Sequence, residues 1–294
     1  MTASSLDRRS FLLAGLSGAA LASGAGIAAA QRRDLVLAFI PQENPEKLLG
    51  DIKVIAPWLS KQVGVPVRGF VTSDHAAAVE ALRNGDADVS FMGALPYVLA
   101  NREIGATVLL AEVYRGAPVY TGRIFVRRDS GIEKLDSLRG KSIAFADPIS
   151  ESGYMYPVEI FAEAGLVKRG QDLKAFFGKV YFAGGYQQAI QAMAAGLVDA
   201  AGVSQYADLL LPPEQQTAIK WIAESKSIPS HTVISRKDLD PALQAKFVAA
   251  MMKLNEPAHR ALLKHVYGPD GYVVADPKAY DGVMELARAY GLLK

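Results

Sequence analysis

Ser150, Ser152 and Gly153 have the types and the spacing of an anion-binding turn at the start of a helix. They follow an apolar run at 142–145 that predicts a strand, and they precede a helix expected to end near Ala164. Free backbone N–H groups and the positive end of a helix meet at such a turn and can hold an anion. The alternative is that serine only caps the helix. Glu151 stands between the serines, so its carboxylate must point away, pair with a cationic group of the ligand, or indicate another ligand.

Further polar side chains follow predicted strand ends or begin predicted helices. They are Gln42 after the first strand, His75 after the second, Tyr97 after the third, Tyr120 and Thr121 just before the strand expected at 123–127, and Tyr186 at a helix start. Ligands of open α/β sheets bind beyond the carboxyl ends of the strands. We therefore expect these residues around a ligand. Several tyrosines and one glutamate would also suit a cationic or amino-bearing ligand, although tyrosine is common at wet interfaces without any ligand.

Catalytic, metal and nucleic-acid chemistry find little support. Beyond the N-terminal 30 residues the chain has no GxSxG, no HExxH and no complete phosphate-binding GxxxxGK[ST] motif, and its four histidines show no metal-ligand spacing. With no cysteine there is no disulfide and no thiolate metal site. Lys and Arg number 32 and Asp and Glu 30, for a net charge of +2, without the basic excess of a nucleic-acid binder. We expect no enzyme, no cofactor, no metal and no nucleic-acid partner.

The elements that must position these residues alternate between strand and helix. A continuous apolar run at 35–40 predicts a buried strand of a parallel sheet, and helical spacing follows at 46–63. Further strands are expected at 67–71, 89–92, 123–127, 142–145, 179–182 and 200–203, and everything after Pro241 is interpreted as helical. Two segments, 77–89 and 188–201, share a pattern of apolar-faced helix, glycine and strand entry. Gly85 and Gly196 suit the left-handed position after a helix. The repeat and the length of 294 residues predict two α/β lobes.

The first 30 residues are interpreted as a cleaved export signal. Arg8 and Arg9 precede an uncharged run from Phe11 that ends in three alanines, Ala28 to Ala30. The paired arginines are typical of the twin-arginine type, which a receptor reads. The four glycines of the run argue against a transmembrane helix. We therefore expect a protein that is soluble in the periplasm after cleavage.

Several motifs together resemble the phosphate/phosphite/phosphonate-type solute-binding proteins of ABC importers, from about Leu35 to Asp240. The stretches that carry the resemblance are SDHAA at 73–77, ALRNGDAD at 81–88, GALPY at 93–97, RDSGI at 128–132, LRGK at 138–141 and DPISESG at 147–153. The resemblance implies a type II periplasmic-binding-protein fold with two lobes joined by two hinge crossings. Lobe 1 would be 34–121 plus 229–294, and lobe 2 would be 122–228. A ligand would close the cleft by hinge motion.

The resemblance also implies the ligand and the partners. Ser150, Ser152 and Gly153 would hold a small oxyanion such as a phosphonate, and Tyr97 would be a pocket tyrosine. Two positions depart from the family pattern, because Glu151 stands where a small hydroxyl residue is frequent and Tyr186 where many relatives have histidine. These departures keep an amino-bearing or neutral solute open as an alternative. The expected partner of the monomeric protein is an ABC permease of the inner membrane, or alternatively a membrane sensor kinase.

Overall fold

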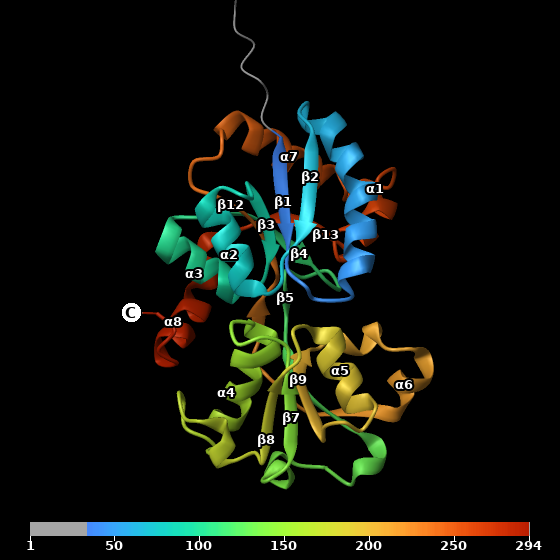
Figure 1. The fold of residues 1–294 in the computed structure, drawn as a ribbon, viewed down its shortest axis with the longest axis vertical. Coiled ribbons are helices and arrows are strands. Elements are labelled where there is room, and N and C mark those ends of the chain that lie inside the picture. The colour runs from blue at the N-terminus through green and yellow to red at the C-terminus, as the bar shows by residue number, and fades with distance from the viewer. Residues whose placement is uncertain (1–33, 294) are drawn as a thin grey trace, which may run out of the picture. The chain divides into compact units, whose positions relative to one another are not determined.

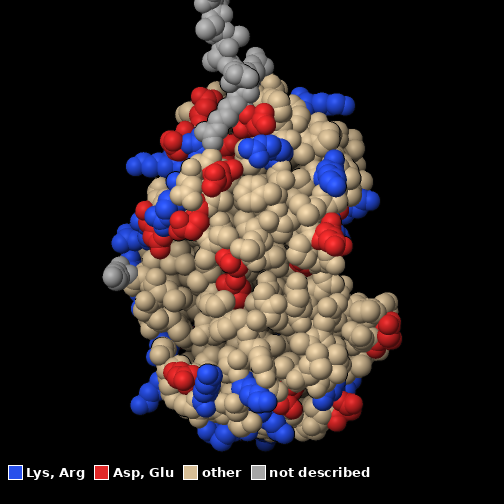
Figure 2. Space-filling model, viewed as in Figure 1, with Lys and Arg blue, Asp and Glu red and all other residues tan. Residues whose placement is uncertain are grey.

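The computed structural model describes residues 34–293 and contains two large β-sheets with helices on both faces of each, and a two-stranded sheet between them (Figure 1). The predicted signal at 1–30 lies outside the described residues. None of the described helices combines the length and the apolar character that crossing a membrane requires. On the face that Figure 2 shows, no continuous basic stripe crosses the described residues.

The larger sheet has six strands in the order β13-β4-β12-β3-β1-β2. Their bounds are β1 Leu35–Phe39, β2 Val67–Val71, β3 Val89–Met92, β4 Thr107–Val113, β12 Thr232–Ser235 and β13 Gly271–Val274. β1 is parallel to β2 and β3. β12 is antiparallel to β3 and β4, and β13 is antiparallel to β4. All five residues of β1 are buried, as expected for a strand covered on both faces.

Five helices cover this sheet, and the sheet and these helices together form lobe 1. They are α1 Pro45–Val63, α2 His75–Asn84, α3 Ala94–Ile104, α7 Pro241–Lys253 and α8 Asp281–Ala289. One core joins α2, α3 and α8, and a second core joins α1 and α7. The ends of α1 are well determined by its sequence: the Asn44 side chain accepts hydrogen bonds from the N–H groups of Glu46 and Lys47, and Gly64 ends the helix at φ 79°.

The smaller sheet, in lobe 2, has five strands in the order β10-β6-β9-β7-β8. Their bounds are β6 Gly122–Arg127, β7 Ser142–Phe145, β8 Lys179–Phe182, β9 Ala200–Ser204 and β10 Ile219–Glu224. The helices are α4 Tyr156–Glu163, α5 Tyr186–Ala194 and the short α6 Pro213–Ala218. α4 contributes to one core of the lobe and α5 to the other. The predicted left-handed glycines are confirmed, with φ 74° at Gly85 and 78° at Gly196.

Two short strands connect the lobes. β5, Val119–Tyr120, pairs antiparallel with β11, Ile228–Pro229, between the two sheets (Figure 1). β6 follows β5 into lobe 2, and β12 follows β11 back into lobe 1. The two-lobed α/β fold is therefore the one predicted. Four strands of each sheet run in one direction, but β12, β13 and β6 run the opposite way, so both sheets are mixed rather than purely parallel.

Three local predictions were wrong. The region after Pro241 is not all helical, because it contains β13, and β4 was not predicted either. β13 is short and includes Gly271, so its apolar pattern is weak without its partner strand. The segment expected as a loop up to Gly153 is partly helical, because a π-helical turn runs from Glu151 to Met155 and continues into α4.

Candidate functional site

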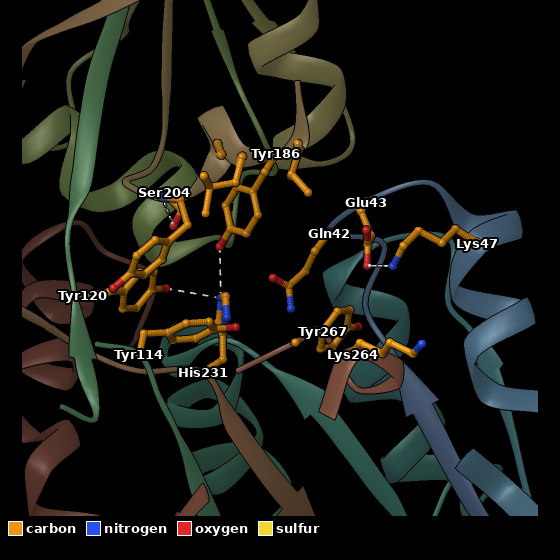
Figure 3. Close-up of a pocket in the computed structure, with 15 residues that line it drawn as sticks. Gln42, Glu43, Lys47, Tyr114, Tyr120, Tyr186, Ser204, His231, Lys264 and Tyr267 are labelled. Atoms are coloured by element: carbon orange, nitrogen blue, oxygen red, sulfur yellow. Dashed lines mark hydrogen bonds and ion pairs between the residues drawn. The ribbon is translucent and has the colours of Figure 1, made fainter. Parts of the chain in front are cut away.

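A cavity of about 300 Å³ lies between the lobes at the crossings, and we call it the tyrosine pocket. It is lined by five tyrosines and ten other residues from both lobes. The tyrosines are Tyr114, Tyr120, Tyr186, Tyr206 and Tyr267, and the other residues are Gln42, Glu43, Lys47, Ser204, Ala207, Leu209, Leu210, His231, Lys264 and Gly268. In Figure 3 the side chains of Tyr120, Tyr186 and His231 converge on one side and those of Gln42 and Tyr267 lie opposite.

The tyrosine hydroxyls act as hydrogen-bond donors, because burial raises the pKa of Tyr114, Tyr120, Tyr186 and Tyr267. Neighbouring glutamates raise these pKa values further, Glu112 beside Tyr114 and Glu151 beside Tyr120. The Tyr267 hydroxyl donates to the carbonyl oxygen of Ile40 at 2.6 Å. A pocket surrounded by neutral phenols offers flat apolar faces and polar edges to a small solute.

His231 lies on one wall of the pocket between two buried glutamates. Its Nδ1 is 3.5 Å from Glu112 Oε2, and its Nε2 is 3.5 Å from Glu151 Oε1. Burial alone would lower the pKa of His231, but its contact with Glu112 and the charges of Glu112 and Glu151 raise it above the ordinary 6.5. Two carboxylates thus favour a protonated imidazole.

Glu151 reaches from lobe 2 into lobe 1 and is 0 % exposed. The Tyr120 hydroxyl donates to its Oε1 at 2.5 Å, and the backbone N–H of Leu95 donates to its Oε2 at 3.3 Å. Leu95 is in the first turn of α3, where no side chain caps the helix and Gly93 is the cap residue. A β-carbon on Gly93 would collide with both carboxylate oxygens, so the close approach requires glycine there. We call Glu151, Tyr120, His231 and Leu95 the Glu151 cluster.

The predicted serine turn supports this cluster from lobe 2. The Ser150 hydroxyl oxygen accepts a hydrogen bond from the N–H of Gly153 at 3.1 Å, as in a cap. Ser152 Oγ is 2.8 Å from the Tyr186 hydroxyl, which is itself 3.1 Å from His231 Nε2. A β-carbon on Gly153 would lie 2.6 Å from that of Ala146, so glycine is required here too. Both serines are buried and have protein partners.

Gln42 has a free donor in the tyrosine pocket. It is 8 % exposed, and its Nε2 has no hydrogen-bond partner. Figure 3 shows its amide pointing into the space between His231 and Tyr267. A buried unpaired amide is costly, so a ligand oxygen at this position would satisfy it.

Cations near the pocket are at its edge. Lys47 is paired at 2.9 Å with both Glu43 and Asp51, and Lys264 is exposed. No arginine is among the lining residues of the described chain. Close to the mouth the lobes touch, where the Asn44 N–H donates to Gln187 Oε1 at 2.9 Å.

The predicted site residues divide into two groups. Gln42, Tyr120 and Tyr186 line the tyrosine pocket, and Glu151 and Ser152 contact its walls. Ser150 and Gly153 form the turn behind them.

The other three predicted site residues have partners elsewhere. Tyr97 packs edge to face on Tyr280 with ring centroids 4.9 Å apart. The Thr121 hydroxyl contacts Gln205 and Glu224. His75 Nδ1 lies 3.1 Å from Asp147 Oδ2, in a polar contact between the lobes.

The sequence did not point to Tyr114, Tyr267 or Glu112 as site residues. His231 was not among the predicted ligand-binding residues either. Glu112 and Tyr114 are at the end of β4, and Tyr267 precedes β13, the two strands that were not predicted. One signal was present: Glu112 is a single charge in an apolar run and is fully buried. Such a residue is usually paired or functional.

Similarities to known proteins identify the group to which the chain belongs. A family model described as "ABC transporter, phosphonate, periplasmic substrate-binding protein" matches residues 37–280. A curated relative, the phosphate-import protein PhnD of Mycolicibacterium smegmatis, is 35 % identical over 172 residues, which is 56 % of this chain and 53 % of the relative. The match thus spans about half the length of that relative.

Solved structures share the fold. PhnD1 from Prochlorococcus marinus, in complex with methylphosphonate, has a TM-score of 0.78 at 18 % identity and covers 88 % of this chain and 99 % of its own. A binding protein component of an ABC phosphonate transporter from Pseudomonas aeruginosa has a TM-score of 0.77 at 21 % identity, covering 86 % of this chain and 85 % of its own. With lobes, crossings and a pocket between them, the chain belongs to the family of ABC-transporter phosphonate periplasmic substrate-binding proteins.

Proposed function

We propose that this chain is the solute-binding component of an ABC importer and that it captures a small oxyanion, such as a phosphonate, between its lobes. The observation that carries the proposal is the tyrosine pocket, which takes residues from both lobes and from the crossings and contains the unpaired Gln42 amide. A solute that touches both lobes stabilises the closed form over the open one. Membership of the family and the PhnD relative support an oxyanion as the solute class.

Capture involves hinge closure at the crossings. The proposed lobes are 34–121 plus 229–294 and 122–228, which places both boundaries at or beside the β5–β11 pair. A pair of two-residue strands is a short connection that absorbs a change in backbone angles more easily than the sheets do. No catalytic step is part of this proposal.

The proposed location is the periplasm, where the closed form would deliver its solute to an inner-membrane permease. The paired Arg8 and Arg9 and the uncharged run that follows support export by the twin-arginine route. The monomeric state is part of the same proposal. The kinase-docking alternative gains no specific support from the site.

Thermal unfolding in the presence of candidate solutes tests the ligand class. The panel is methylphosphonate, aminoalkylphosphonates, phosphate, phosphite, sulfate and quaternary amines. A solute present at about 100 times its Kd stabilises the protein by about 2.7 kcal/mol. We expect at least one phosphorus oxyanion to raise the Tm more than sulfate does. A rise only with quaternary amines or uncharged solutes would overturn the oxyanion assignment.

A further inference from the structure

The Glu151 carboxylate occupies an anion site that is assembled only when the lobes meet. Its hydrogen-bond donors are the Tyr120 hydroxyl at one crossing and the Leu95 N–H at the start of α3 in lobe 1. His231 at the other crossing lies 3.5 Å from the carboxylate and provides the counter-charge when protonated. The carboxylate itself comes from the lobe 2 turn that was predicted to hold the oxyanion of a solute. An acidic side chain from lobe 2 thus meets a helix N-terminus of lobe 1, the place where an anion is favoured.

These donors are already satisfied without a solute. Glu151 is 0 % exposed, and Gly93 leaves room for its two oxygens against the start of α3. A second anion placed on the same donors would meet the carboxylate at close range. Two like charges about 4 Å apart in a partly buried site repel strongly enough to reduce affinity by about a thousandfold.

We infer that Glu151 is an internal substitute for the anionic group of the solute: it closes the unliganded cleft and competes with the oxyanion for Tyr120, His231 and Leu95. The competition with an oxyanion rests on the proposed function, whereas closure of the cleft without a solute can be measured independently of it. Affinity is then set by two contributions, the binding of the solute and the displacement of the carboxylate, because only the fraction of molecules with a vacated site can bind.

The first experiment measures closure without any ligand. Since the chain contains no cysteine, Val54→Cys on α1 and Leu197→Cys after α5 introduce two unique labelling sites that are 47 % and 77 % exposed. Pulsed electron–electron resonance between spin labels then gives the distance between the lobes. We expect one short distance for the parent pair and an additional longer distance in Glu151→Thr, with an intermediate population in Glu151→Gln, which keeps the shape but loses the charge.

The second experiment measures binding of methylphosphonate and phosphate by calorimetry. Glu151→Thr restores the small hydroxyl frequent in the family and is expected to bind the oxyanion a hundredfold to a thousandfold more tightly than the parent. Glu163→Thr is the matched control, because Glu163 is exposed on α4 and pairs with Lys226. It should change neither the distance nor the affinity. Circular dichroism confirms that each variant folds.

The outcomes separate the two proposals. If the lobe distance of Glu151→Thr equals that of the parent, the inference is wrong, whatever the ligand. If the variant opens but binds an oxyanion no more tightly than the parent, competition is refuted while closure stands. If neither protein binds any oxyanion at millimolar concentration, the proposed ligand class fails, and the distance measurement still decides the closing role of Glu151.

Discussion

The two sides of His231 differ in how their polar groups are satisfied. On the Glu151 cluster side, the carboxylate, the Tyr120 hydroxyl and the Leu95 N–H are paired with one another. On the tyrosine pocket side, the Gln42 amide has no partner. The paired groups of the first side stabilise the interface between the lobes without a solute. The unpaired amide of the second side lacks an acceptor, which a solute can supply. In the unliganded protein the cluster side is thus internally paired, whereas the pocket side keeps a donor free for a solute.

The two sides of His231 also differ in their buried charges. The cluster side contains two buried glutamates around one histidine, and the tyrosine pocket contains neutral phenols with its lysines at the edge. A buried charge loses more than a neutral donor does when its partner is removed. Substitutions in the cluster should therefore change stability, and substitutions in the pocket should change affinity.

The largest expected effect is that of His231→Leu. Removing the imidazole leaves Glu112 and Glu151 buried without their counter-charge, which costs about 3–5 kcal/mol of the free energy of unfolding. Urea unfolding measures the loss. His231→Gln, which retains a hydrogen-bond donor, should lose less. A loss below about 1 kcal/mol in the leucine variant would contradict the view that the cluster depends on this charge.

The next effect is that of Gln42→Leu on affinity. The amide nitrogen has no protein partner, so its removal should not lower the free energy of unfolding. Loss of its bond to a ligand oxygen should weaken solute binding by roughly tenfold to a hundredfold. Titration calorimetry measures the affinity. Gln191→Leu, at an exposed position of α5, is the control that should change neither quantity. Unchanged affinity in Gln42→Leu would remove this residue from the pocket's recognition surface.

The smallest effect is a pH dependence of stability due to His231. Its pKa in the folded protein is raised above 6.5, so folding favours the protonated form. The extra stability is complete below about pH 6.5 and is lost as the pH rises through the raised folded pKa. It amounts to about 1.4 kcal/mol for every tenfold gain in the proton affinity of the imidazole on folding. Chemical unfolding of the ligand-free protein at several pH values between about 6 and 9 measures it.

His231→Gln should remove that part of the pH dependence. Glu112, Glu151, Tyr114, Tyr120 and Tyr186 surround the imidazole, but the tyrosines remain protonated over this range because their pKa values are raised. A parent protein whose stability increases over this pH range, with the variant unchanged in its slope, would contradict the assignment to His231.

Much of the architecture could be predicted from local sequence. The buried strand β1, the capped helix α1 and the left-handed Gly85 and Gly196 each depend on side-chain periodicity or backbone freedom within a few residues. The apolar run of β4 carries a local strand signal that was not used, whereas β13 could not be predicted in this way. β13 is paired only through β4 at the sheet edge, so its state depends on a partner more than a hundred residues away in the chain.

Local sequence likewise predicted only part of the candidate site. Gln42 and Tyr186 were found because one follows a strand end and the other begins a helix, where side chains face a cleft. Tyr120 was found because the family resemblance implies a crossing there. Tyr97 also belongs to a helix that follows a strand, but it points to Tyr280 beside α8, and strand order alone does not reveal that neighbour.

The sequence by itself determined the family, the α/β alternation and the unusual acidic residue between two serines, because these depend on residue type and short spacing. Only the tertiary structure decided what that acidic residue does. Glu151 meets Leu95, Tyr120 and His231 from distant parts of the chain, and only their packing shows that its charge is buried against donors rather than directed into solvent. The physical reason is that a buried carboxylate is placed by its partners, and those partners come together only through the packing of segments that are far apart in the chain.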